Sequence, residues 1–384
     1  MDVSGSLLTP VGGHCLGFSK SEKVAEFKPG YTYSWSAART SSYTALLPLS
    51  FPYLALLMRT RRAYFLPLLF LGTLVAAGFS LAIGTIEVDW QQVYQGIVAG
   101  RPSLHYEVVM GIRLPRALNA FLVGGMLAVA GALMQVLLRN PLADPYVLGV
   151  SGGASVGALL ALTWGWAEAG VSGAAAVGAL FSLFIVFGLA RGAGHWSSTR
   201  LLLTGVVMAA GWGAMVSFLL AISPEAHLRG MLFWLMGDLT ERLPGGFRVG
   251  LLALGLGVSV YVARSLNLLA TGEQRAASLG VNTVSLRLIL YFTAGVLTAS
   301  AVTLAGAIGF VGLVVPHIVR LVIGADHRLV VPGSLLAGGA LLIVSELVAR
   351  TIMAPNELPV GIVTAFIGVP TFLFLLRRSA TSRS

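Results

Sequence analysis

Long apolar segments recur along most of the chain, and each is about as long as a helix that crosses a bilayer. They lie at 63–86, 117–138, 146–166, 169–190, 201–222, 249–263, 288–323, 329–349 and 358–376. About 20 helical residues cross the hydrocarbon core of a membrane, so most of these segments predict one helix each. Residues 288–323 are too long for one crossing and must fold back. The residues that offer a break there are Gly306, Gly309, Gly312 and Pro316.

The pattern therefore predicts an all-α polytopic membrane protein with ten transmembrane helices. Residues 1–58 differ from the rest, because they contain scattered prolines, serines and threonines and no sustained apolar pattern. We predict that they form a disordered N-terminal extension. A second interpretation is that translation begins at Met58, which is followed by arginines and then by the first apolar segment. The ten-helix domain is then predicted to span residues 59–384.

Arginines are distributed unevenly over the predicted loops. On the side that holds Arg59, Arg61 and Arg62 we count fourteen arginines and three acidic residues, against seven arginines and nine acidic residues on the other side. Loops rich in positive charge remain in the cytoplasm. With ten crossings, both termini are therefore predicted to be cytoplasmic.

The composition excludes several classes of protein. Only 10% of the 384 residues are charged and 56% are apolar, whereas about a quarter of the residues of soluble domains are charged. The net charge of +10 is scattered singly between apolar segments, so we expect no nucleic-acid partner. All three lysines precede residue 29, and no GxxxxGK[ST] sequence occurs. Any ATP hydrolysis must therefore belong to another subunit.

The chain offers little material for a catalytic or metal site. Its single cysteine, Cys15, permits no internal disulfide, and its six histidines are scattered without an i, i+4 pair. Glu346 is the main charged residue inside a predicted helix. We therefore expect no catalytic residue, no metal and no cofactor in this subunit.

A short internal repeat is visible. Residues 130–141 match residues 305–316 at six of twelve positions. By our count of crossings the two copies run in opposite directions, which predicts the inverted repeat common in transporters.

Four polar segments between the predicted helices are candidates for a functional role. Arg113-Leu114-Pro115-Arg116 lies on the outer side, where it either snorkels to the interface or binds acidic side chains of an external partner. Residues 140–145 and 195–200 form cytoplasmic turns, the second with Ser198 or Thr199 predicted to cap the next helix. Residues 267–282, the longest internal cytoplasmic loop, combine apolar and charged residues and are predicted to form short helices that contact a partner.

Taken together, these motifs resemble one family. They are Arg113 to Arg116, Asn140 to Pro145 with Leu148 to Ser151, Gly306 to Phe310 with Pro316-His317, Asp326 to Arg328, and Glu357 to Gly361. In this order over residues 63–378 they resemble the permeases of binding-protein-dependent ABC importers for vitamin B12, haem and ferric siderophores. The resemblance implies a type II importer permease in the bacterial inner membrane, which pairs with a second copy of itself. It also implies two cytoplasmic ATPase subunits, which use ATP and Mg²⁺, and a periplasmic binding protein.

The resemblance also assigns roles to residues. It implies that Arg113, Arg116 and Arg350 dock the binding protein, and that helices five and ten line the pathway. The implied cytoplasmic gate consists of Asn140, Leu142, Ser198 and Thr199. The residues implied to contact the ATPase are Leu268, Leu269, Gly272, Glu273, Ala276, Leu279 and Gly280. One departure is Asp238, which follows Trp234 and Gly237 where the family often has serine.

Other functions remain to be weighed. An ion-coupled secondary transporter shares the number of helices, but its uptake would not depend on an ATPase. A membrane-embedded enzyme would need clustered nucleophiles, acids or metal ligands, which the sequence lacks. The substrate stays open among ferric siderophores, haem and cobalamin. His105, His227 and Arg229 are candidates for contacting haem, although they also suit solvated loops.

Overall fold

The computed structural model describes residues 50–100, 102–191, 197–239 and 242–381, and every regular element in these ranges is a helix. Residues 52–384 form one compact unit, to which the following description applies. Residues 1–49 of the predicted N-terminal extension lie outside the described residues, whereas residues 50–58 already belong to the first helix.

Ten apolar helices coincide with the predicted segments, and the long segment 288–323 supplies two of them. They are α1 (Ser50–Ala82), α4 (Leu114–Leu137), α5 (Val150–Thr163), α6 (Glu168–Arg191), α7 (Ser198–Ile222), α9 (Gly246–Tyr261), α12 (Thr283–Ala305), α13 (Val311–Ile323), α14 (His327–Thr351) and α15 (Val360–Thr381). Among the described residues, six helices are long and apolar enough to cross a membrane, or seven if the bent pair α9–α10 is one span. The prediction of a polytopic helical membrane protein is confirmed, and the count of ten crossings stays a prediction.

Short helices connect the long ones. They are α2 (Trp90–Ala99), α3 (Leu104–Tyr106), α8 (Glu225–Met236), α10 (Ala263–Ala270), α11 (Glu273–Ser278), a π-helix (Glu107–Arg113) that leads into α4, and a 3₁₀ turn (Pro145–Leu148). Helices α10 and α11 confirm the short helices predicted within 267–282. The predicted cap of the helix after residue 197 is wrong by one position. Ser197, rather than Ser198 or Thr199, accepts the backbone N–H of Arg200 at 3.0 Å, because its extended backbone lets the hydroxyl turn back to the first turn.

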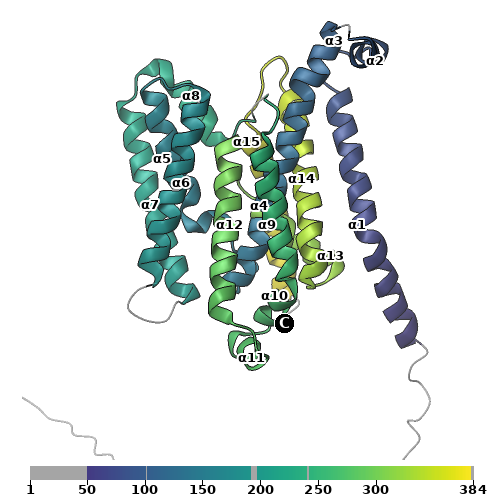
Figure 1. The fold of residues 1–384 in the computed structure, drawn as a ribbon, viewed down its shortest axis with the longest axis vertical. Helices are drawn as coiled ribbons and strands as arrows, with labels where there is room; N and C mark the ends of the chain where they lie inside the picture. The colour runs from purple at the N-terminus through teal and green to yellow at the C-terminus, as the bar shows by residue number, and fades with distance from the viewer. Residues whose placement is uncertain (1–49, 101, 192–196, 240–241, 382–384) are drawn as a thin grey trace, which may run out of the picture. The chain divides into compact units, whose positions relative to one another are not determined.

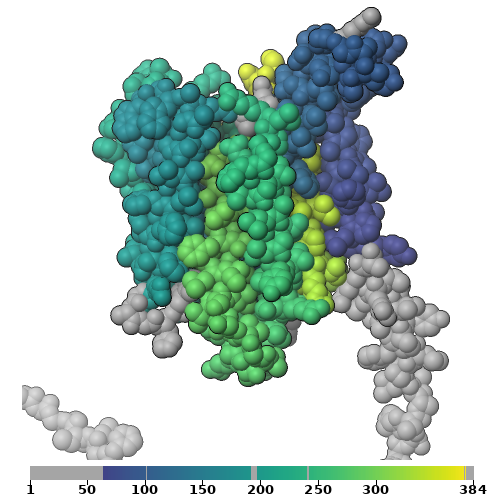
Figure 2. All heavy atoms as spheres, viewed as in Figure 1, coloured from purple at the N-terminus to yellow at the C-terminus, as the bar shows by residue number. Residues whose placement is uncertain are grey.

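Helix α4 lies at the centre of the unit, where it packs against α12, α13 and α14 (Figure 1). Its backbone approaches two of these neighbours closely, because glycines face each other at the contacts. A Cβ atom at Gly131 would lie 1.9 Å from the carbonyl oxygen of Gly312 in α13, and one at Gly124 would lie 2.1 Å from that of Gly338 in α14. Helices α5, α6, α7 and α8 form a second group beside this centre, shown in teal in Figures 1 and 2.

The break in residues 288–323 lies where the sequence predicted it, between Gly306 and Phe310. Gly312 and Pro316 do not contribute to the break, since both lie inside α13. The two copies of the short repeat also differ locally. Residues 130–137 are helical, whereas 306–310 are not. This sequence match therefore does not mark two equivalent structures, and the inverted repeat stays a prediction.

A tyrosine from the segment between α4 and α5 forms hydrogen bonds with the backbone of the break. The Tyr146 hydroxyl donates to the carbonyl oxygen of Ile308 and accepts its N–H, both at 2.9 Å. Non-helical backbone inside a membrane protein needs such partners, because no lipid group supplies them.

We therefore expect Tyr146→Phe to lower the free energy of unfolding by about 2 kcal/mol, because it leaves both backbone groups of Ile308 without this hydroxyl. Unfolding in mixed micelles would measure the change. Tyr94→Phe, at a tyrosine that is 65% exposed in α2, serves as the control and should have little effect. Equal losses in the two variants would contradict the role assigned to Tyr146.

Candidate docking and coupling sites

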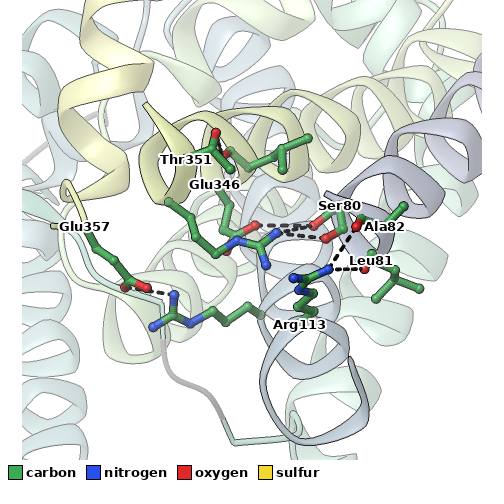
Figure 3. A network of polar contacts seen from close by, with 10 residues as sticks. Ser80, Leu81, Ala82, Arg113, Glu346, Thr351 and Glu357 are labelled. Carbon is green, nitrogen blue, oxygen red and sulfur yellow. Dashed lines mark hydrogen bonds and ion pairs between the residues drawn. The ribbon is translucent and has the colours of Figure 1, made fainter. Parts of the chain in front are cut away.

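A buried ion pair lies near the C-terminal end of α14. Glu346 and Arg350 are one helical turn apart, and Arg350 Nε lies 3.2 Å from Glu346 Oε1. The two residues are only 2% and 7% exposed. Ser80, in the last turn of α1, donates its hydroxyl to Glu346 Oε2 at 3.3 Å and accepts Arg350 Nη2 at its backbone oxygen at 2.8 Å. The pair therefore fastens α14 to the end of α1 (Figure 3).

Arg113 also binds the C-terminal end of α1. Its Nη1 atom donates to the carbonyl oxygens of Leu81 at 2.8 Å and Ala82 at 3.0 Å, and its Nη2 atom donates to that of Ile86 at 2.5 Å. The last carbonyl groups of a helix have no partner within the helix, and a cation is favourable there. Arg113, which is 2% exposed, therefore acts as a buried cap of α1.

Arg116 has a different environment. Its Nη1 atom lies 2.8 Å from Oε2 of Glu357, in the loop between α14 and α15. The side chain of Glu357 is 48% exposed, whereas that of Arg116 is 11% exposed. The structure thus brings the three predicted docking arginines close together, because Arg113 and Arg350 both bond to the end of α1 and Arg116 lies three residues after Arg113. Docking itself stays a prediction.

Cavities open beside this cluster. One of about 630 Å³ is lined by Arg116 of α4, by residues of α5, α6 and α12, and by the connecting segments that hold Trp166, Asp238 and Arg242. Asp238, the departure noted in the sequence, is exposed and donates its backbone N–H to the carbonyl oxygen of Ala305 at 3.0 Å. This acidic residue therefore adds negative charge to the rim near Arg116. A further cavity of about 610 Å³ lies between α6, α9 and α12.

Helices α10 and α11 lie at the opposite end of the unit (Figure 1). The predicted contact residues there divide into three sets. Leu269 and Ala276 are buried and hold the short helices against the rest of the unit, whereas Leu279 is 64% exposed and Gly280 is also exposed. The other three are Leu268 and Gly272, which are half-buried, and Glu273, which forms an ion pair with Arg287 of α12.

Asn267 connects this region to the start of α14. Its Nδ2 atom donates to Asp326 Oδ1 at 2.8 Å, and its Oδ1 atom accepts the backbone N–H of His327 at 2.9 Å. Burial alone would raise the pKa of Asp326. The hydrogen bonds from Asn267 and from the backbone of Arg328, together with the nearby positive charges, outweigh burial and hold the pKa below its usual value. Asp326 therefore stays ionised as the cap of α14.

The predicted gate residues surround the junction of α4 and α7. Asn140 Oδ1 accepts the backbone N–H of Leu142 at 2.9 Å, which closes a turn just after α4. Ser198 Oγ donates to the carbonyl oxygen of Leu137 at 3.1 Å, so the start of α7 lies against the end of α4, with Thr199 exposed beside it. The neighbouring Asp144 has its pKa raised to about 6, because burial outweighs its hydrogen bond from the backbone of Tyr146.

Sequence reasoning missed several of these contacts. The i, i+4 spacing of Glu346 and Arg350 could have revealed their pairing, but the sequence suggested a separate role for each residue. Contacts between distant residues, such as Asn267 with Asp326 and Gln135 with Arg320, leave no such local signal. Within the described part of the chain, no group of three or more His, Cys, Asp or Glu side chains is placed to hold a metal ion.

Comparisons with known proteins point to one family. The model of the FecCD transport family matches residues 72–378. The chain is 44% identical over 287 residues to the cobalamin import system permease protein BtuC of Halobacterium salinarum, covering 72% of this chain and 75% of that protein. It is 40% identical over 287 residues to the hemin transport system permease protein HmuU of Yersinia pestis, covering 73% and 86%. A solved structure described as an inward-facing conformation of a metal-chelate type ABC transporter matches with a TM-score of 0.71 and 32% identity, covering 82% of this chain and 99% of that one.

Proposed function

The chain belongs to the FecCD transport family, and from this premise we propose that it is the permease subunit of an ATP-driven importer that moves a metal chelate into the cytoplasm by alternating access. The observation that carries the proposal is the extent of the family match, which runs from α1 to α15. The chain also lacks a GxxxxGK[ST] sequence, so a separate ATPase would supply the energy.

The two ends of the unit suit two different partners. We assign the end with Arg113, Arg116 and Arg350 to the periplasmic side and the end with α11 to the cytoplasmic side, because the α11 side carries more arginine. In this orientation the arginine end receives the binding protein and the α10–α11 end receives the ATPase. Both termini are then cytoplasmic, in an inner membrane.

Asn267 supports a route for the motion. Closure of the ATPases would move α10 and α11, and the hydrogen bonds of Asn267 to Asp326 and His327 would transmit this movement to α14. The junction at Asn140 and Ser198 would then change as α4 and α7 move apart. We assign α7 and α15 to the pathway wall and to pairing with a second copy. Exposed apolar side chains on both helices, such as Val207 and Phe366, support this assignment.

The substrate belongs to the class of metal chelates. Relatives named for cobalamin and for hemin are almost equally similar to this chain, so similarity alone does not choose between them. The test is uptake by proteoliposomes that contain the permease, its ATPase and the binding protein, with cyanocobalamin, haemin and ferrichrome as probes. We expect one probe to enter only when Mg²⁺ and ATP are present. Uptake without the ATPase that a protonophore abolishes would instead identify an ion-coupled transporter.

The exposed Leu279 provides a test of the coupling end. We expect Leu279→Asp to weaken ATPase binding about tenfold or more, because a buried apolar contact at an interface is worth at least about 1.4 kcal/mol when it is central. The matched control is Leu104→Asp in α3, which is 66% exposed at the opposite end and should leave the affinity unchanged. Affinity measured by biolayer interferometry on nanodiscs would decide, and equal effects would reject the assigned contact.

A further inference from the structure

Of the three predicted docking arginines, Arg116 is the one whose carboxylate partner is exposed at the surface. Arg113 and Arg350 are 2% and 7% exposed, and their guanidinium groups bond to backbone oxygens of α1 and, for Arg350, to Glu346. A carboxylate from outside would have to break these buried contacts to reach them. The ion pair of Arg116 differs, because its partner Glu357 is 48% exposed.

An ion pair with one exposed partner is exchanged more easily than a fully buried pair. Water and salt screen the exposed carboxylate of Glu357, whereas breaking the buried pair of Arg350 leaves a buried charge without its partner. A carboxylate of an external protein therefore replaces Glu357 on Arg116 at much lower cost than it replaces Glu346 on Arg350.

The nearby charges favour replacement of Glu357 by the incoming carboxylate over binding of that carboxylate beside Glu357. A small cavity of about 20 Å³ is lined by three carboxylates, Asp238, Glu346 and Glu357, and by two guanidinium groups, Arg116 and Arg350. Among the residues that line this cavity, carboxylates already outnumber guanidinium groups, so a fourth carboxylate would add further negative charge. Departure of Glu357 offsets that added charge.

Glu357 also lies in a segment that joins several helices. Leu358 donates its backbone N–H to the carbonyl oxygen of Ala349 in α14 at 3.1 Å, and Val360, the first residue of α15, donates to that of Gly237 at 3.0 Å. Gly237 directly follows α8. The Glu357 side chain is therefore one attachment of a loop whose backbone contacts α14, α15 and the end of α8. Releasing this side chain removes that attachment.

From these contacts we propose that Glu357 is a built-in competitor for docking: it occupies Arg116 until a carboxylate of the binding protein takes its place. Arg113 and Arg350 are positioning residues that hold the ends of α1, α4 and α14 around this exchange site. Displacement of the loop that contains Glu357 then moves the start of α15 when the binding protein docks. The proposal rests on the proposed function, which makes the arginine end the docking surface.

The test compares the affinity of the binding protein for the full-length permease in nanodiscs. Glu357→Gln removes the competing charge, and we expect the affinity to rise about three- to tenfold. Glu225→Gln, at an exposed acid of α8 at the same end, removes an equal charge away from Arg116 and should change the affinity much less. Arg116→Gln should weaken docking, and in its background Glu357→Gln should have no further effect.

The outcomes separate the two proposals. If Arg116→Gln leaves the affinity unchanged, the docking assignment itself fails. If Arg116→Gln weakens docking but Glu357→Gln weakens it too or has no effect, docking stands and the competitor role is rejected. An equal gain in Glu357→Gln and Glu225→Gln would show general repulsion between acidic surfaces and would also reject it.

Discussion

Replacing Arg350 with methionine is expected to lower the free energy of unfolding by about 3–5 kcal/mol, because it leaves the buried carboxylate of Glu346 without its ion-pair partner. Glu346 is 2% exposed and has Arg350 as its ion-pair partner at 3.2 Å. The same substitution removes the hydrogen bond to the backbone oxygen of Ser80, so α1 also loses an attachment to α14. Unfolding in mixed micelles, with yield after detergent extraction as a second measure, would quantify the loss.

The double variant Glu346→Gln, Arg350→Met distinguishes the buried charge from simple loss of packing. Replacing a buried pair with uncharged groups is often close to neutral, so the double variant should recover most of the stability. Glu357→Gln is the control for a pair whose carboxylate is exposed and should change the stability by less than about 1 kcal/mol. A double variant as unstable as Arg350→Met alone would show that the charge on Glu346 is not the cause.

Adding a single methyl group at Gly131 is expected to cost about 3 kcal/mol, at the upper end of the range for overpacked cores. The new Cβ atom would lie 1.9 Å from the carbonyl oxygen of Gly312. Because that atom is backbone, no rotamer change can relieve the overlap, and α4 must move away from α13. The free energy of unfolding of Gly131→Ala, measured in the same micelles, tests this expectation.

Gly257→Ala is the matched control, since Gly257 also lies inside an apolar helix, α9, but has nothing within 4 Å of the added Cβ atom. Alanine favours helix over glycine by up to about 1 kcal/mol, so this variant should be neutral or slightly more stable. Similar losses at the two positions would mean that helix propensity, and not the contact between α4 and α13, determines the result.

The helices were predictable because apolar length is a local property. The runs of apolar residues located all the long helices, and glycine at 306 located the break between α12 and α13. The ends of the helices were predicted less accurately, because the local sequence is compatible with more than one boundary. The sequence predicted the first long helix over 63–86, whereas α1 runs from Ser50 to Ala82. Helices α2 and α8, which are too short to cross, were not predicted.

The candidate site was predictable only in part. The arginines and the segment 267–282 were identified by motif. Arg113 and Arg350 lie at the C-terminal end of α1, and Figure 1 shows α10 and α11 at the opposite end of the unit. Apart from Glu346, which lies four residues from Arg350, the partners of these arginines were not identifiable, because those partners are far away in the sequence. Glu357 lies 241 residues from Arg116, and Ser80 lies 270 residues from Arg350. Such pairings depend on how the helices pack, and neither periodicity nor local spacing encodes them.

Helix α14 is held at both ends, by Asn267 at its start and by Ser80 near its finish. Its 25 residues span about 37 Å, which is roughly the full thickness of a membrane. Attachment at both ends restricts sliding of the helix on its own, so in the proposed mechanism a displacement at its start also moves its finish. In the proposed importer, substitutions of Asn267 or Ser80 that weaken these attachments should therefore reduce uptake per ATP consumed without changing the wall of the pathway.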